Sequence, residues 1–326
     1  MRSIMAALLL LLPGEAHATD FHGPAPMKNR HPLYTGLLLP PPEAAPPVDR
    51  TRWEVSFDYT NVFLHGTDDH WAVAHDYELA ALTVGARHPL GERLEAGFAA
   101  PLFYQYAGFM DGVLRAWHRL IGVRGYAGQD EDPDYRYQQH TTYDDKEVMR
   151  GREREVVPGD VTLWVKGRLW REGESLVSLA LYGQLPTGDA GTGLGSGGYE
   201  YGLRLAGSTV AEGVGLTWGL GYTGPSRFAG IATGVDYAGM WTGFFASEWP
   251  LEWMVPSSDG WTMIVQSMAN GSPVPETGFY QYGDPFYDLT VGLRHLLPDG
   301  TVWTVSLSEN LNKTNPDFTL DVTVGW

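Results

Sequence analysis

Hydrophobic and polar residues alternate in several segments of the chain from Trp53 onward. In residues 53–59 the odd positions are Trp, Val, Phe and Tyr, and the even positions are Glu, Ser and Asp. Similar alternation occurs in residues 161–169, 199–206, 214–222, 287–294 and 303–308. A period of two places successive side chains on opposite faces of a β-strand. These segments therefore predict strands with one apolar and one polar face.

The intervals between the predicted strands are alternately short turns and long polar loops. The short turns span residues 88–92, 171–174, 209–213 and 297–300, and the long loops span residues 64–75, 108–157, 186–198, 225–234, 270–284 and 310–316. This asymmetry is typical of bacterial outer-membrane barrels, whereas a soluble sandwich would bury its apolar face against a second sheet. We therefore predict an all-β fold, an antiparallel transmembrane β-barrel of about twelve strands. The turn at residues 250–259 is less regular, so the range is roughly ten to fourteen strands.

The last predicted strand ends the sequence on an aromatic residue. Its apolar face consists of Phe318, Leu320, Val322, Val324 and Trp326, and Thr319, Asp321, Thr323 and Gly325 lie on the other face. This pattern resembles the terminal signal that the barrel-assembly machinery recognises in outer-membrane proteins. We expect that machinery to be a partner of this chain.

The first residues have the pattern of a secretory signal. Arg2 precedes an apolar run at residues 4–12, and the small residues at 16–18 fit a cleavage site. The run is shorter than the roughly 20 residues of a membrane-spanning helix. We expect residues 1–18 to be a signal peptide, so the protein would be exported to the outer membrane of a Gram-negative bacterium, where lipid and lipopolysaccharide surround it.

A proline-rich segment precedes the first predicted strand. It contains prolines at positions 40–42 and at 46 and 47, which disfavour both a sheet interior and a helix. We expect residues 19–50 to form an extended or coiled extension, either in the periplasm or inserted in the lumen. Residues 51–326 would then form the barrel.

One stretch of the longest loop has helical rather than strand periodicity. Apolar residues recur at helical spacing in the segment 108–125, and Asp111 stands near its start as a cap. This spacing predicts a short amphipathic helix in the loop between strands 3 and 4. We interpret it as a plug over the mouth, with Asp111, Trp117 and His118 as candidates for a constriction.

The composition supports a barrel and excludes several kinds of chemistry. The chain has 41 Gly, 12 Trp and 17 Tyr, with 19% charged residues, which suits twisted strands and aromatic girdles. It has no cysteine, which excludes disulfides, thiolate metal sites and cysteine nucleophiles. The formal net charge of −17 argues against a nucleic-acid partner, because phosphates would be repelled.

Several charged residues fall on the faces predicted to point inward. They are Glu54, Asp58, Glu200, Arg204, Asp288, Arg294 and Asp321. These side chains would either pair with one another across the lumen or line a path for a solute, and the sequence leaves both readings open.

The predicted outer loops contain metal-ligand residue types without a diagnostic spacing. The segment 129–155 is acidic enough to attract a hard cation, but it more simply forms a solvated loop. His65, His70 and His75 recur at a spacing that matches no standard metal motif. The glycine-rich segment 191–198 lies between two predicted strands and is interpreted as a flexible outer loop rather than a phosphate cradle. We therefore predict no metal site and no cofactor.

The chain resembles an uncharacterised family of Gram-negative outer-membrane proteins, a domain-of-unknown-function family. The motifs that carry the resemblance are Asn29-Arg30-His31-Pro32-Leu33, Leu39-Pro40-Pro41-Pro42-Glu43, Tyr59-Thr60-Asn61, Gly108-Phe109-Met110-Asp111-Gly112 with His118 and Gly122, Pro158-Gly159-Asp160 and Leu185-Pro186-Thr187-Gly188-Asp189. The last two motifs are also similar to barrels associated with uptake of aromatic compounds. The Arg30-His31 pair departs from a more amide-rich version of this motif in the family. The resemblance implies a barrel with an amino-terminal extension and brings no substrate or catalytic residue.

Three functions remain open from the sequence. The leading hypothesis is a passive channel or transporter for a small molecule, which could be hydrophobic. The second is an envelope anchor or binding protein, and the third is a lipid-modifying enzyme. The enzyme is disfavoured because His118 and His295 have no recognisable serine nucleophile motif beside them, so no catalytic residue is assigned.

Overall fold

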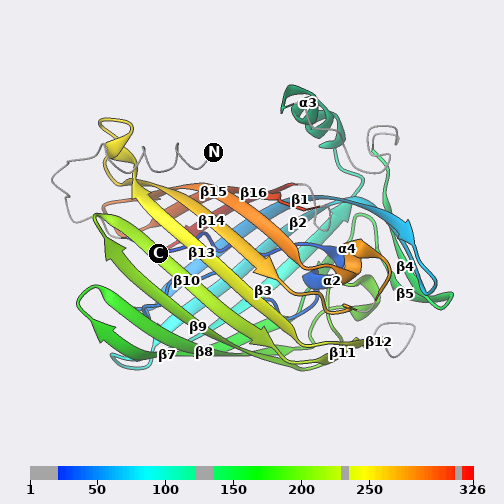
Figure 1. The fold of residues 1–326 in the computed structure, drawn as a ribbon, viewed down its shortest axis with the longest axis horizontal. Coiled ribbons are helices and arrows are strands. Elements are labelled where there is room, and N and C mark those ends of the chain that lie inside the picture. The colour runs from blue at the N-terminus through cyan, green and yellow to red at the C-terminus, as the bar shows by residue number, and fades with distance from the viewer. Residues whose placement is uncertain (1–20, 122–134, 229–234, 276, 313–317) are drawn as a thin grey trace.

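The computed structural model describes residues 21–121, 135–228, 235–275, 277–312 and 318–326, except the side chains of Leu114, Trp117, His118, Leu120 and Ile121. In this part of the chain, twelve antiparallel strands form one closed sheet (Figure 1). They are β1 (Arg52–Thr67), β2 (Trp71–Pro89), β3 (Leu94–Tyr106), β7 (Val161–Glu172), β8 (Ser175–Leu185), β9 (Glu200–Ala211), β10 (Val214–Thr223), β13 (Met240–Pro250), β14 (Trp261–Asn270), β15 (Phe286–Leu296), β16 (Val302–Asn310) and β17 (Phe318–Gly325). The predicted all-β barrel of about twelve strands is confirmed.

The ring closes between the first and the last strand. β1 and β17 pair from Glu54 opposite Gly325 to Asn61 opposite Phe318. Trp53 and Trp326 continue the ladder, because each backbone N–H donates to the carbonyl of the other at 3.0 Å. A closed ring leaves no unpaired strand edge, which is what a sheet in lipid requires.

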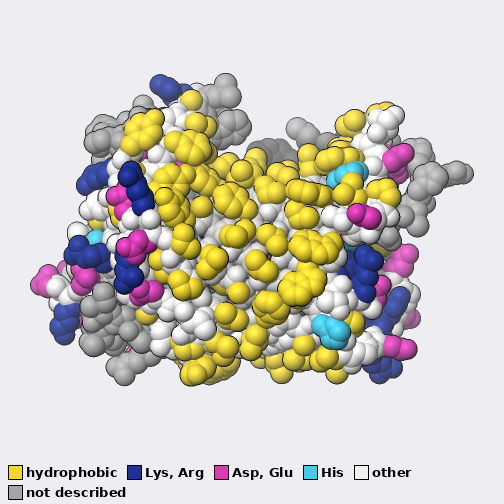
Figure 2. Space-filling model, turned by 180° about the vertical axis from the view of Figure 1, so that it is seen from behind, with side chains coloured by type: hydrophobic (Ala, Val, Ile, Leu, Met, Phe, Trp, Pro, Cys, Tyr) yellow, Lys and Arg dark blue, Asp and Glu magenta, His cyan; other side chains and the backbone are white. Residues whose placement is uncertain are grey.

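The period-two alternation separates an apolar outer face from a polar inner face. Figure 2 shows apolar side chains across the middle of the wall and charged side chains gathered at its two ends. On the inner face, polar residues such as Thr60, Gln266 and Thr290 are buried. This is the reverse of a soluble protein and is the arrangement of a barrel whose outer band contacts lipid tails.

The connections at the two ends of the barrel differ in length, as predicted. At one end, called here the short-turn end, β9 and β10 are joined at Glu212 and Gly213, whose φ angles of 51° and 76° are those of a tight turn that matches the strand twist. The irregular turn 250–259 is a single connection containing the 3-10 helix η2 (Leu251–Trp253), so it adds no strand. The longer connections lie at the opposite, long-loop end.

The long loop between β3 and β7 contains more structure than the sequence predicted. The expected helix is present as α3 (Asp111–Ile121). The loop also contains β4 (Gln138–Tyr143), β5 (Lys146–Arg150) and β6 (Val156–Pro158), which were not predicted. β4 pairs with the outer half of β2 and extends the sheet beyond the ring. Its many polar residues gave no alternation of hydrophobic and polar positions, so periodicity could not identify it.

Two smaller elements complete the long-loop end. β11 (Ser226–Phe228) pairs with β12 (Val235–Tyr237), and the single-turn helix α4 (Tyr280–Gly283) precedes β15. Among the described residues, no helix has the length and apolar character needed to span a membrane.

Residues 21–50, called here the insert, run through the interior of the barrel (Figure 1). The insert rises from the short-turn end, turns at the single-turn helix α2 (Pro32–Thr35) and returns to β1. The expectation that this segment forms no helix was wrong. Proline is well suited to the first helical position, and the His31 side chain caps the turn by accepting from the Leu33 N–H at 3.1 Å.

The tip of the insert packs into the main hydrophobic cluster of the protein. Leu33, Tyr34, Leu37 and Leu39 are buried there. They pack with residues from the long-loop end, which include Trp71, Val73, Met149, Leu194, Tyr282 and Phe286. The interior of the barrel is apolar at this tip cluster, because both the insert and the outer loops supply apolar side chains.

The apolar outer band predicts how a charged substitution changes the stability of the barrel. Val291 is 46% exposed near the middle of β15, and we expect Val291→Arg to reduce the unfolding free energy by about 2–4 kcal/mol, because arginine is costly at the bilayer midplane. Urea unfolding in lipid vesicles measures this change. Val255→Arg, at an exposed position of the short-turn end, is the matched control and should change stability little. Equal effects of the two substitutions would contradict a lipid-facing band.

Candidate functional site

The seven charged residues predicted to point inward all lie on the inner face. Six are buried, and Glu54 is partly exposed. Five of the seven contact the insert. Asp58 pairs with Arg30, Glu200 accepts from the Leu38 N–H, Arg204 donates to the Pro40 and Pro41 carbonyls, Asp288 accepts from Asn29 at 2.9 Å, and Arg294 donates to the Gly23 and Pro24 carbonyls at 2.8 and 3.1 Å.

The remaining two residues contact the wall itself. Glu54 lies 3.6 Å from the Arg87 guanidinium. Asp321 accepts from the Thr323 hydroxyl. The polar face of the sheet therefore holds the insert in the lumen, and mutual pairing across the lumen is the lesser part of its role.

Two buried ionic groups fix the insert at the short-turn end. In the first, Glu248 pairs with Arg294 at 2.8 Å and accepts from the backbone N–H groups of His22 and Gly23 at 3.0 and 2.9 Å. A carboxylate with several donors is well stabilised although it is removed from water. This group holds the first residues of the insert against β13 and β15.

The second ionic group holds the returning limb of the insert. Glu43 accepts from Lys166 at 3.1 Å and from the Tyr182 hydroxyl, and Lys166 also pairs with Glu95 at 3.1 Å. Burial would raise the pKa of Glu43, but Lys166 and the nearby guanidinium groups outweigh burial and hold the pKa at about 2. Glu43 is therefore ionised at any physiological pH.

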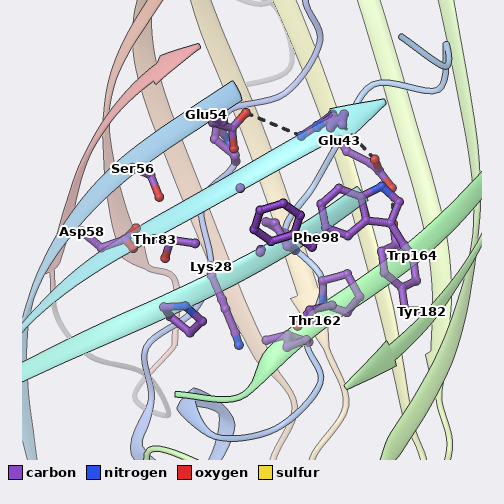
Figure 3. A pocket seen from close by; sticks show the side chains of 18 of the residues that line it. Lys28, Glu43, Glu54, Ser56, Asp58, Thr83, Phe98, Thr162, Trp164 and Tyr182 are labelled. Carbon is purple, nitrogen blue, oxygen red and sulfur yellow. Dashed lines mark hydrogen bonds and ion pairs between the residues drawn. The ribbon is translucent and has the colours of Figure 1, made fainter. Parts of the chain in front are cut away.

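A cavity of about 100 Å³ remains between the insert and the wall formed by β1, β2, β3, β7 and β8 (Figure 3). Small residues, among them Ser56, Gly85 and Ala99, line the wall there and leave space between the wall and the insert. Apolar surface comes from Trp164, Tyr182 and the prolines of the insert. Pockets with an apolar lining and a few polar groups are typical of small-molecule sites.

The residues proposed as a plug lie elsewhere. In Figure 1, α3 projects away from the barrel rather than into the lumen. Asp111 accepts from the Asn61 side chain at 3.3 Å, which fixes the start of the helix beside β1. The side chains of Trp117 and His118 lie outside the described residues, so their role as a constriction stays a prediction.

The three histidines of the outer loop do not converge on a common site. His75 is buried, where its Nε2 lies 2.9 Å from the Thr141 hydroxyl, while exposed His70 lies 2.7 Å from Asp144. Hydrogen bonding to Asp144 raises the pKa of His70. In the part of the chain that the structure describes, no group of three or more His, Asp or Glu residues could hold a metal ion.

Two other candidates are placed by the structure. His295 stacks on Trp261 with ring centroids 4.4 Å apart, and its Nδ1 contacts the Gly260 carbonyl at 3.2 Å. The glycine-rich segment 191–198, expected to be a flexible outer loop, folds inward instead. Asp160 accepts from both the backbone and the hydroxyl of Ser196 there, which fixes the segment in the mouth of the barrel.

Sequence reasoning missed the charged residues on both sides of the contact between the insert and the wall. Lys28, Arg30 and Glu43 belong to a segment without periodicity, so no pattern marked them. Glu95 and Glu248 lie on inward faces of strands and were detectable in principle as charges within apolar alternation. Their partners in the insert were not detectable, because the insert is remote from these strands in sequence.

The closed sheet, the apolar outer band and the polar lumen define a β-barrel of the outer-membrane type. The fold is similar to that of the COG4313 outer membrane channel from Pseudomonas putida F1, with 14% identity, coverage of 86% of this chain and 96% of that chain, and a TM-score of 0.55. A Pseudomonas aeruginosa FadL homologue matches with 9% identity, 94% and 99% coverage and a TM-score of 0.40. The CymD monoaromatic hydrocarbon channel matches with 9% identity, 85% and 87% coverage and a TM-score of 0.41.

The family follows from the sequence itself. Residues 1–325 match the model of the family described as "Protein of unknown function (DUF3187)", and the chain belongs to this family. The resemblance to an uncharacterised family is thereby confirmed. Among curated proteins, none matches the chain.

The ionic group around Arg294 predicts a measurable stability difference. Arg294→Met leaves buried Glu248 without its cation, and we expect a loss of about 3–5 kcal/mol of unfolding free energy in urea titrations. The control is Arg152→Met, which removes an exposed pair with Asp189 and should cost less than about 1 kcal/mol. A loss no larger than that of the control would show that the insert is not held by this group.

Proposed function

We propose that this protein is a passive outer-membrane channel for a small molecule, including molecules with an apolar body, and that the insert restricts its opening. The observation that carries the proposal is the cavity between the insert and the wall. Family membership and the barrel fold support a place in the outer membrane. In such barrels the short turns face the periplasm.

The proposed path runs from outside to the periplasm past the insert. The tip cluster lies between the cavity and the long-loop end, so it closes the outer side. Glu54 and Arg87 line the cavity near the short-turn end and keep part of their surface exposed, which supports access from the periplasmic side. Passage then requires the tip of the insert to shift away from the outer loops.

The filled lumen also favours a second candidate. A barrel that is permanently closed by its own amino-terminal segment would serve as an anchor, and its outer loops would bind another envelope component. Both candidates place the insert in the lumen. They differ in whether it moves.

A disulfide that locks the insert distinguishes them. Leu38 lies just after α2, and its carbonyl accepts from the Thr223 hydroxyl at 2.9 Å, so in a chain without cysteine Leu38→Cys with Thr223→Cys joins the tip of the insert to β10 by a single added bond. We expect liposome swelling with small solutes for the reduced variant and loss of swelling after oxidation. The matched control is Ser175→Cys with Thr209→Cys, which joins β8 to β9 without touching the insert and should swell in both states.

Removal of the insert gives the complementary result. Deletion of residues 22–49 should raise single-channel conductance above that of the intact protein if the insert is a barrier. A barrel that stays sealed to all solutes when reduced and after the deletion would contradict the channel and support the anchor.

A further inference from the structure

We propose that the cavity binds a small organic anion, whose acid group is held by the ammonium of Lys28 and whose apolar body lies against Trp164 and Tyr182. This inference rests on the proposed function of the cavity, and it specifies the chemical class of the cargo.

Lys28 is the cation of this cavity that lacks a charge partner. Its Nζ donates to the carbonyls of Leu37 and Thr35 at 3.2 and 3.4 Å. Among the described residues, no carboxylate lies within ion-pairing distance of this ammonium. An ammonium has three donors, so two long bonds to neutral carbonyls leave both one hydrogen and the charge uncompensated.

The free surface of Lys28 faces the cavity rather than bulk water. The side chain is enclosed by protein, yet it retains some accessible area, because it lines the cavity. In Figure 3 the Lys28 side chain runs through the lower middle of the view, between Thr83 and Thr162, and its nitrogen points away from Trp164. A ligand that extends from Trp164 toward Thr162 would reach the ammonium.

The carboxylates around Lys28 accept hydrogen bonds from other groups. Asp58 pairs with Arg30, and Asp160 accepts from Gly188 and Ser196. Glu200 accepts from the Leu38 N–H. A cationic ligand would meet Lys28 as a like charge, whereas an anion would supply the partner that the protein does not.

Burial makes the protonation state of Lys28 sensitive to the molecule that occupies the cavity. Burial, and then the neighbouring Arg30, lower the pKa of Lys28 to about 7, against weaker attraction from Glu200, Asp160 and Asp58. A bound carboxylate would favour the charged form and raise this pKa. Binding of an anion should therefore take up a proton at neutral pH.

The remaining lining fits an apolar body with few hydrogen bonds. Trp164 and Tyr182 offer aromatic surface, and Pro40 and Pro101 add rigid apolar surface. The cavity volume of about 100 Å³ restricts the occupant to a small molecule and excludes a protein segment or a large glycan. A carboxylic acid with an aromatic or short aliphatic body is the simplest occupant of this shape and charge.

The test compares an anion with its neutral isostere. Radiolabelled trans-cinnamate and trans-cinnamamide would be equilibrated with the full-length mature protein in nanodiscs at pH 6. We expect the acid to bind about tenfold more tightly than the amide, because a charge-assisted bond replaces a neutral one. Octanoate and octanamide, as a second pair, show whether the body must be aromatic.

Three lysine variants separate charge from structure. Lys28→Met should lower cinnamate binding to the level of the amide, whereas Lys146→Met, at an exposed position in β5, should leave the preference intact. As pH rises from 6 to 9, Lys28 loses its proton, so the preference of the wild type for the acid should fall while amide binding stays constant. Lys28→Arg should keep the preference without this pH dependence, because arginine stays charged.

Equal binding of acid and amide by the wild type, or a preference that survives Lys28→Met, would overturn this inference. So would failure of all four probes to bind. The swelling assay is independent of these results, so a channel that admits neutral solutes would leave the proposed function standing while the anion site fails.

Discussion

The structure depends on the requirement that every backbone hydrogen-bonding group in the bilayer finds a partner within the sheet. β1 and β17 meet that requirement when they close the ring, and closure fixes both the number of strands and the width of the lumen. About eight strands leave an interior that side chains fill, and sixteen or more leave a water-filled channel. Twelve strands lie between these limits. The inner side chains alone do not fill the interior, and the insert occupies much of the remainder.

The composition of the insert suits this position. Proline has no N–H, so a proline-rich segment places few buried donors in the lumen but keeps all its carbonyls. The wall supplies the complementary groups. Arg204 donates to the carbonyls of Pro40 and Pro41, and Arg294 donates to those of Gly23 and Pro24. The same residues that exclude the segment from a sheet thus make it a good acceptor for buried arginines.

The alternation of hydrophobic and polar residues was sufficient to predict the barrel but not the contacts of the segment inside it. A period of two assigns each strand residue to a face, so the inward position of Arg204 or Asp288 was predictable before its neighbours were known. The partner of an inward charge is not encoded in that period. Glu200 and Leu38 meet although they are 162 residues apart in sequence. For the same reason α2 was missed, because a single capped turn has no periodicity to detect.

The two ends of the insert resist movement for different physical reasons. Shifting its base would separate the buried pair of Glu248 and Arg294, which costs about 3–5 kcal/mol when one partner is lost. Shifting its tip would expose Leu33 and Tyr34, each worth about 1.5–3 kcal/mol of apolar burial. These two free-energy costs are similar, so a movement that opens a path must replace the lost contacts of the insert with new ones. A cargo that supplies a counter-charge to Lys28 and apolar surface to the cavity offers such an exchange, whereas a simple anion offers only the counter-charge and water offers neither.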